Sequence, residues 1–294
     1  MCKALEKIID FRLRWFLEKT CYLSPQQNGF RKNRSIYNNI HNIQKDIIKS
    51  QETNQAMGLV ALDIAKAYDT TWRPRIIEQL QKILCNGNLL IFIKNFLEDR
   101  FFKVKINGHL SSTFNQENCV PQGSTLSVTL FLVAINYISE RIKFPVKSSL
   151  FADDLNIWCS GKNTQNIQPY LQDTLLSLAA WSEISGNRFS SFKSQSIIFT
   201  RTTKYPSLDV RIYNTQIQTS RSIKILGITF DRKNTWNSHL KDLRKVTMLR
   251  MNILETLTHT SWGANSITLK QIYTSYYPNL NTVLLSFLIP NNLV

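Results

Sequence analysis

The chain has 294 residues, a length that suits about two structural units with a sizeable buried core. Hydrophobic residues make up 43%, which excludes a disordered chain, and the net charge of +16 indicates a polyanionic partner, most often nucleic acid. A solvated basic surface is the alternative to such a partner. The five cysteines form no CxxC pair, which argues against a disulfide framework or a structural zinc site and favours a reducing compartment.

Hydrophobic periodicity predicts alternating helices and short strands in the first half of the chain. The expected elements are a helix over 3–19, a basic loop over 24–34, a helix over 35–50, a buried strand over 57–63, helices over 75–84 and 88–98, and a β-hairpin over 101–114 that turns at Asn107-Gly108. Such short elements in irregular order are typical of a mixed fold.

The second half continues in the same way. The expected elements are a helix over 125–142, a hairpin of strands 146–151 and 155–159, a helix over 168–184, strands over 194–200 and 222–230, and a helical end over 237–276. Two uncharged stretches, 118–139 and 271–294, are broken by Pro and Asn, so no membrane span is expected. Helices and strands in this order predict the α+β class.

Four acidic residues fall at or near the ends of apolar strands. Asp63 ends MGLVALD, Asp69 follows it, and Asp153 and Asp154 lie at the tip of the second hairpin. A rigid strand delivers a side chain to a fixed point, and converging carboxylates are the ligands that a pair of Mg²⁺ ions needs for in-line phosphoryl transfer. An ordinary acidic β-turn is the alternative for Asp153 and Asp154.

Two further segments have a composition suited to nucleotides. In VPQGSTLS (120–127), Gly123 would let the backbone approach a ligand closely, and the N-terminus of the following helix would offer free N–H groups. The loops at 29–34 and 187–195 combine Lys and Arg with Phe, which suits phosphate contact and base stacking. The alternative for 120–127 is an ordinary loop with Pro and Gly at its bend. The alternative for the two basic loops is a solvated basic face.

Six segments occur in one order at compatible spacings, and together they are far more specific than any one of them. They are QNGFRKNRS (27–35), LDIAKAYD (62–69), VPQGSTLS (120–127), FADD (151–154), FSSFKS (189–194) and KILGITFDRKNTWNSHL (224–240). In these segments the chain resembles the reverse transcriptases of non-LTR (LINE-type) retrotransposons, and the jockey-like group most closely.

The resemblance implies an α+β right-hand polymerase fold, in which helices pack on the antiparallel sheet of the palm. Residues 1–56 would form partial fingers, residues 57–235 the palm with a fingers-like insertion at about 72–118, and residues 236–294 a partial helical thumb. The family's RPIS-type fingers segment is absent ahead of KALEKIIDFRL, so the chain is expected to be truncated at its N-terminus.

The resemblance also implies roles for single residues. Asp63, Asp153 and Asp154 would be the catalytic metal ligands, Lys193 would act on the triphosphate, Tyr68 would be the steric gate against a 2′-OH, Gln122, Gly123 and Arg31 would bind substrate, and Leu226 and Gly227 would grip the primer. Asp69 is expected to be structural. Three positions depart from the family pattern, with Tyr68 in place of Phe, Cys119 in place of Gly and Val128 in place of Pro.

The implied activity is RNA-directed DNA synthesis, in which a primer 3′-OH attacks the α-phosphorus of a dNTP with the aid of two Mg²⁺ ions, or of Mn²⁺. The implied partners are an RNA template, a DNA primer and dNTP, with no membrane, and the oligomeric state stays open. The family would place the chain inside the cell, in nucleus and cytoplasm as a ribonucleoprotein.

Two alternatives use the same segments. One is an inactive fragment that only binds nucleic acid, and the other is a two-metal nuclease built on the same carboxylates. The PQG pocket and the steric-gate aromatic disfavour the nuclease, because both features serve nucleotide selection.

Overall fold

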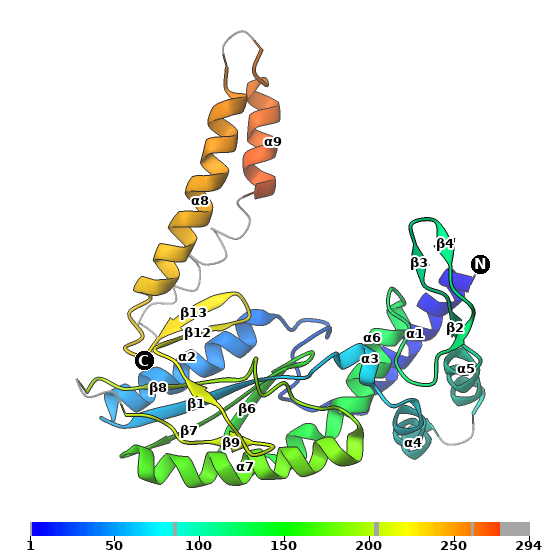
Figure 1. Cartoon of the computed structure of the whole chain (residues 1–294), viewed down its shortest axis with the longest axis horizontal. Helices are drawn as coiled ribbons and strands as arrows, with labels where there is room; N and C mark the ends of the chain where they lie inside the picture. The colour runs from blue at the N-terminus through cyan, green and yellow to red at the C-terminus, as the bar shows by residue number, and fades with distance from the viewer. Residues whose placement is uncertain (1, 85–86, 203–205, 260–261, 277–294) are drawn as a thin grey trace.

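The computed structural model describes residues 2–84, 87–202, 206–259 and 262–276. Its centre is a five-stranded sheet in the order β11-β8-β1-β7-β6 (Figure 1). The strands are β1 (Ala56–Asp63), β6 (Lys147–Phe151), β7 (Asp154–Gly161), β8 (Gln195–Phe199) and β11 (Gln218–Thr219). Neighbouring strands pair antiparallel, except that β11 joins β8 in parallel. The palm-like mixed fold expected from the sequence is therefore present.

The helices surround this sheet and extend from it. They are α1 (Cys2–Lys19), α2 (Ile36–Glu52), α3 (Ala67–Thr70), α4 (Arg73–Leu84), α5 (Asn88–Leu97), α6 (Thr125–Ile135) with the 3₁₀ turn η1 (Asn136–Arg141), α7 (Thr164–Ser185), α8 (Asn237–Leu257) and α9 (Ser266–Tyr276). Figure 1 shows α2 and α7 on opposite faces of the sheet, while α8 and α9 rise away from it.

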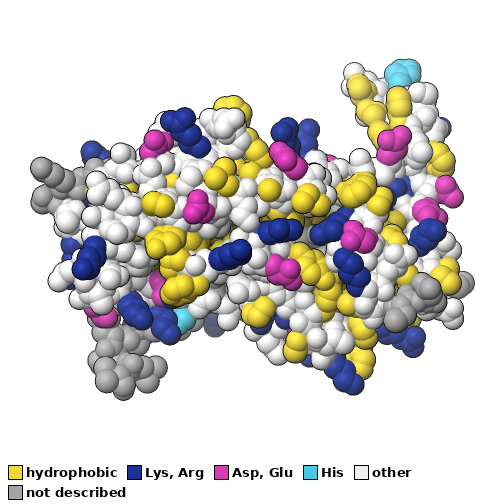
Figure 2. All heavy atoms as spheres, turned by 90° about the horizontal axis from the view of Figure 1, so that it is seen from below, with side chains coloured by type: hydrophobic (Ala, Val, Ile, Leu, Met, Phe, Trp, Pro, Cys, Tyr) yellow, Lys and Arg dark blue, Asp and Glu magenta, His cyan; other side chains and the backbone are white. Residues whose placement is uncertain are grey.

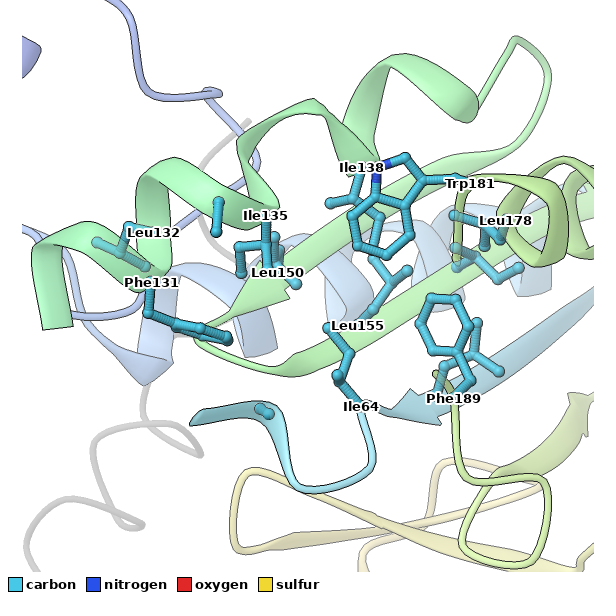
Figure 3. Packing of buried hydrophobic residues seen from close by; sticks show 14 of the residues in the cluster. Ile64, Phe131, Leu132, Ile135, Ile138, Leu150, Leu155, Leu178, Trp181 and Phe189 are labelled. Carbon is cyan, nitrogen blue, oxygen red and sulfur yellow. The ribbon is translucent and has the colours of Figure 1, made fainter. Parts of the chain in front are cut away.

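The two faces of the sheet bury two different hydrophobic clusters, because side chains alternate along each strand. In β1, Val60 and Leu62 belong to the cluster that α6 and α7 cover, whereas Met57 and Leu59 belong to the cluster beneath α2. Figure 3 shows the first cluster, in which Phe131 of α6 and Trp181 of α7 lie near the sheet. The central strand is thus buried on both sides.

Short ladders complete the fold. They are β2 (Phe101–Phe102) with β5 (Phe114–Asn115), β3 (Lys105–Ile106) with β4 (His109–Leu110), β9 (Arg211–Ile212) with β10 (Thr215–Gln216), and β12 (Ser222–Ile225) with β13 (Ile228–Asp231). The first two ladders confirm the hairpin expected around Asn107-Gly108. The strands β9, β10 and β11 were not expected, because each has two residues and is too short to show an alternating pattern in the sequence.

The structure differs from the expected boundaries at three helices. The helix expected over 125–142 changes to a 3₁₀ turn at Asn136. The helix expected from 168 begins at Thr164, because the Asn163 side chain accepts a hydrogen bond from the Asn166 N–H at 3.0 Å and caps it. The run expected as helix over 237–276 is divided into α8 and α9.

The expected thumb segment extends to residue 294, and its residues 277–294 lie outside the described residues. In the part that is described, no helix has both the length and the apolar character that crossing a bilayer needs.

We expect Trp181→Ala to lower the free energy of unfolding by about 3–5 kcal/mol, because it empties a fully packed site. Trp181 is 2% exposed and its ring lies 6.2 Å from that of Phe189. The matched control is Ile184→Ala on the same helix, where the side chain is 59% exposed and little should change. Chemical denaturation measures both, and equal losses would contradict the assignment of α7's buried face.

Candidate active site

The antiparallel pairing of β1 and β7 brings two distant carboxylates together. Asp63, the last residue of β1, lies directly opposite Asp154, the first residue of β7. Residues opposite each other in such a ladder have Cβ atoms roughly 4.5–5.5 Å apart. The register that buries the core therefore also places these two acids at the same end of the sheet.

Asp153 lies in the tight turn between β6 and β7, where Phe151 pairs with Asp154. The turn also contains Ala152, whose φ of 54° is in the left-handed region that residues with a side chain seldom adopt. Ala152 is buried, while both aspartates are partly exposed. The turn thus presents two adjacent carboxylates from a backbone that is itself packed inside the protein.

Burial and mutual repulsion change the acidity of these carboxylates. Burial, then the charges of Asp153 and Asp63, raise the pKa of Asp154 from an ordinary 3.8 to about 6. Burial is also the main cause that raises the pKa of Asp153, and the Asp63 charge adds to it. The positive charge of Lys193 opposes both shifts. Burial and the neighbouring carboxylates therefore disfavour the ionised form of both residues more than Lys193 favours it.

Lys193 reaches the carboxylates from a loop that extends the sheet. Ala65 N–H donates to the Arg188 carbonyl at 2.7 Å and Ser190 N–H to the Asp63 carbonyl at 2.8 Å. These bonds bring the Lys193 Nζ to 3.1 Å from Asp63 Oδ2. That oxygen is buried and accepts no hydrogen bond of good geometry. Lys193 therefore offsets part of its charge while the oxygen remains able to accept a further contact.

A cavity of about 170 Å³ joins these groups to the turn of the β12–β13 hairpin. Its lining includes Asp63, Asp154, Lys193, Lys224 and Leu226. Leu226, expected with Gly227 to grip the primer, lines this cavity beside the carboxylates. Lys224 was missed, although its position between Ile223 and Ile225 in an alternating strand is a signal that its side chain points away from the core.

The same hairpin turn has an unusual backbone. Leu226 has a φ of 48° and Gly227 a φ of 87°, and Ile225 pairs with Ile228 across them. Two consecutive positive φ values are those of a type I′ turn, which suits the twist of the two strands. Gly227 meets this requirement without strain, whereas Leu226 holds a conformation that costs free energy.

Tyr68 lies between the carboxylates and the core. Its ring stacks on Phe131 with centroids 4.8 Å apart and planes 26° apart. Burial, and then the charge of Asp153, raise the pKa of its hydroxyl group. Tyr68 is therefore an aromatic side chain that packs on the core at Phe131 and lies close to Asp153.

The PQG segment makes hydrogen bonds with Tyr68 and its neighbour Asp69. Val120 N–H donates to the Tyr68 carbonyl at 3.2 Å, and Gln122 Nε2 donates to Asp69 Oδ1 at 2.8 Å. Gly123 has a φ of 84°, and a Cβ there would meet open space. Cys119 has a φ of 83°, which explains why a glycine suits that position. Asp69 thus has a side-chain partner in the PQG segment.

The helix N-terminus after PQG differs from the expectation. Leu126 N–H donates to Glu6 Oε1 at 3.2 Å, and Ser127 N–H donates to Ser124 Oγ at 3.3 Å. The Ser124 hydroxyl also bonds to Glu6. A carboxylate from α1 already caps α6, so these N–H groups are not free for a nucleotide as the sequence analysis expected.

Arg31 makes its contacts with other residues of the fold. Its guanidinium is paired with Glu18, at 2.6 and 2.8 Å, and bonds the Ser24 carbonyl at 2.8 Å. Its side chain is 6% exposed. A substrate contact by Arg31 would require the Glu18 ion pair to open, so its contacts in this structure are those of a loop anchor.

Positive charge is spread over the surface. Figure 2 shows Lys and Arg scattered among apolar and acidic side chains on the face that it draws. No group of three or more His, Cys, Asp or Glu side chains within the described ranges is arranged to hold one metal ion. The three aspartates are thus neighbours whose oxygens do not yet converge on a single point.

Sequence comparison places the chain among polymerases. A family model described as reverse transcriptase (RNA-dependent DNA polymerase) matches residues 1–230. The RNA-directed DNA polymerase from mobile element jockey of Drosophila melanogaster is 27% identical over 250 residues, covering 83% of this chain and 27% of that protein. The probable RNA-directed DNA polymerase from transposon BS of the same organism is 26% identical and is covered to 29%. The chain thus spans less than a third of these relatives.

Solved structures show a similar fold. Telomerase from Candida tropicalis, in complex with a TWJ fragment of telomeric RNA, has a TM-score of 0.55 at 13% identity, covering 95% of this chain and 46% of that one. The corresponding Candida albicans telomerase has a TM-score of 0.52 at 13% identity, covering 97% and 49%. The polymerase fold and the resemblance to jockey-like polymerases are confirmed. From the family match over most of its length, the chain belongs to the reverse transcriptase (RNA-dependent DNA polymerase) family.

Proposed function

We propose that this chain carries out RNA-directed DNA synthesis, as a reverse transcriptase domain of the kind found in non-LTR retrotransposon polymerases. The observation that carries the proposal is the cavity shared by Asp63, Asp154, Lys193 and the turn at Leu226. These residues come from segments far apart in the sequence, and each belongs to a motif of the family.

The aspartates would hold divalent metal, which enzymes of this family generally use. Aspartate oxygens are the hard ligands that Mg²⁺ prefers, and the raised pKa of Asp154 marks negative charge that a divalent ion would offset. We assign the site to two Mg²⁺ ions, or Mn²⁺, held by Asp63, Asp153 and Asp154. When bound, such ions activate the primer hydroxyl and stabilise the charge on the triphosphate.

The other residues would arrange the substrates around that site. Lys193 would neutralise the triphosphate and donate a proton to the departing pyrophosphate, a step for which it must exchange Asp63 for the nucleotide. Tyr68 would exclude a ribose 2′-OH, and Gln122 and Gly123 would line the pocket of the templating pair. Leu226, with Gly227, would support the end of the primer strand.

The proposed partners are an RNA template, a DNA primer and dNTP. Within this proposal, residues 1–56 act as partial fingers, residues 57–235 as the palm with an insertion near 72–118, and residues from 236 onward as a partial thumb. The separate small ladders of residues 101–115 support the insertion, and the start of α8 at Asn237 supports the last boundary. The spread of basic residues suits contact with a nucleic acid backbone.

Primer extension tests the proposal directly. With an RNA template, a DNA primer, dNTPs and Mg²⁺, we expect extension by the wild type and a loss of about a thousandfold or more for Asp153→Ala. Asp173→Asn on α7 is the control, since Asp173 is exposed and remote from the motifs. Template binding without extension by the wild type would instead support a scaffold that only binds nucleic acid. Cleavage of a labelled strand without dNTP would support the nuclease.

The pH dependence of stability tests the electrostatics. Because the folded protein raises the pKa of Asp154 from 3.8 to about 6, ionisation of this group destabilises the fold as pH rises through that range. We therefore expect Asp154→Asn to raise the free energy of unfolding by about 1 kcal/mol at pH 7.5, after allowance for solvent screening, and by much less at pH 4. Urea denaturation at both pH values measures this, and an equal effect at both would refute it.

The Tyr68 proposal predicts a change in sugar selection. In Tyr68→Val, the preference for dNTP over rNTP should fall by about 10- to 100-fold, because no ring remains to meet the 2′-OH. Tyr68→Phe keeps the ring and should keep the preference. Single-nucleotide incorporation measures both ratios, and an unchanged preference in Tyr68→Val would remove Tyr68 from the substrate pocket.

A further inference from the structure

The turn that carries Asp153 and Asp154 is held by a loop near the N-terminus, 125 residues away in the sequence. The amide of Gln27, which is 2% exposed, contacts both polar backbone groups of Ala152. Its Oε1 accepts from the Ala152 N–H at 3.1 Å, and its Nε2 donates to the Ala152 carbonyl at 3.3 Å. Oε1 also accepts from the Gly29 N–H at 2.8 Å. One buried side chain therefore fixes the residue that precedes both aspartates.

The backbone of the loop makes the same attachment along β6. Asn28 N–H donates to the Leu150 carbonyl at 2.8 Å, and Leu150 N–H donates to the Gln26 carbonyl at 2.9 Å. Gln27 and Leu150 form a parallel bridge. The loop thus adds a parallel β-bridge to the edge strand β6, beside the turn.

Gly29 brings the loop into close contact with the turn. A Cβ at Gly29 would overlap the backbone nitrogen of Ala152 and lie 3.0 Å from the carbonyl carbon of Phe151. Both neighbours are backbone atoms, which cannot rotate away as the end of a side chain can. Any side chain at this position would therefore displace the turn or the loop.

The turn needs such support for two reasons. Ala152 has a φ of 54°, a conformation that persists only where the surrounding structure enforces it. The adjacent carboxylates also repel each other, and with Asp63 they place three negative charges at one end of the sheet. Without a tether, both the strain and the repulsion favour opening of the turn.

We propose that Gln27 and Gly29 are positioning residues, which hold the turn of Asp153 and Asp154 in the geometry that binds divalent metal. The proposal rests on the proposed function, because it concerns the same site. Neither residue lines the cavity that Asp63, Asp154 and Lys193 share. Groups that orient metal ligands in this way typically change metal affinity or activity by about 10- to 100-fold when they are removed.

Gln27→Met tests the amide, because methionine keeps the length of the side chain without its polar atoms. We expect Mn²⁺ affinity, measured from the electron paramagnetic resonance signal of free Mn²⁺, to fall by about 10- to 100-fold. In primer extension, kcat should fall while KM for dNTP changes little. The matched control is Gln51→Met, which removes another buried glutamine that donates to the Lys233 carbonyl, near the opposite end of β1 from Asp63.

The outcomes separate this proposal from the proposed function. A wild type that binds Mn²⁺ without extending a primer would overturn the function, while the affinity of Gln27→Met would still decide the positioning role. If Gln27→Met matched Gln51→Met in Mn²⁺ affinity and in kcat, the positioning role would be wrong. A wild type that binds no Mn²⁺ would overturn both.

Gly29→Ala keeps the proposal testable if Gln27→Met does not fold. Its matched control is Gly87→Ala, where the new Cβ would meet only the Leu84 carbonyl oxygen at 3.6 Å. We expect Gly29→Ala to weaken Mn²⁺ binding and Gly87→Ala to leave it unchanged. Equal affinities in these two variants would overturn the role of Gly29.

Discussion

Three carboxylates repel one another at one end of the sheet, and the surrounding structure must overcome that repulsion. Asp63 and Asp154 face each other across the β1–β7 ladder, and Asp153 adjoins them. Burial is the main cause that raises the pKa of Asp153 and of Asp154, and the charge of Asp63 raises both further. Lys193 alone lies within ion-pair distance of Asp63 among the described residues. The surrounding backbone must hold these charges together, and that requirement explains why the loops beside them are so closely bonded.

Two loops meet this requirement from opposite sides. The loop around Arg188 and Ser190 bonds the end of β1 and delivers Lys193. The loop around Gln27 bonds the turn between β6 and β7. Neither loop forms a regular element of its own, but the backbone of each makes hydrogen bonds with a strand of the sheet or its end. Rigid sheet and irregular loop together give a site whose backbone is fixed while its carboxylates stay partly open to solvent.

The sequence predicted the elements that follow from periodicity and the residues that lie in motifs. The strand ending at Asp63 and the hairpin carrying Asp153 were visible because apolar runs lead up to them. Lys224 was missed because a single basic residue in a short strand has no distinctive neighbours, and the capping of α6 by Glu6 was missed because it joins residues 118 positions apart. How such distant groups meet is decided by the packing of whole elements, which the local pattern of a single segment does not show. The roles of the residues themselves stay predictions until they are measured.

The alternation of β1 between two clusters has a consequence for errors of folding. If β1 slipped by one residue against β7, Leu62 would face Asp154, and Val60 and Leu59 would exchange faces of the sheet. Both clusters would then be unpacked, so a misaligned chain would be too unstable to persist. The register that packs both clusters is also the register in which Asp63 lies opposite Asp154. The alternating apolar residues of β1 thereby also select the strand pairing that builds the carboxylate site.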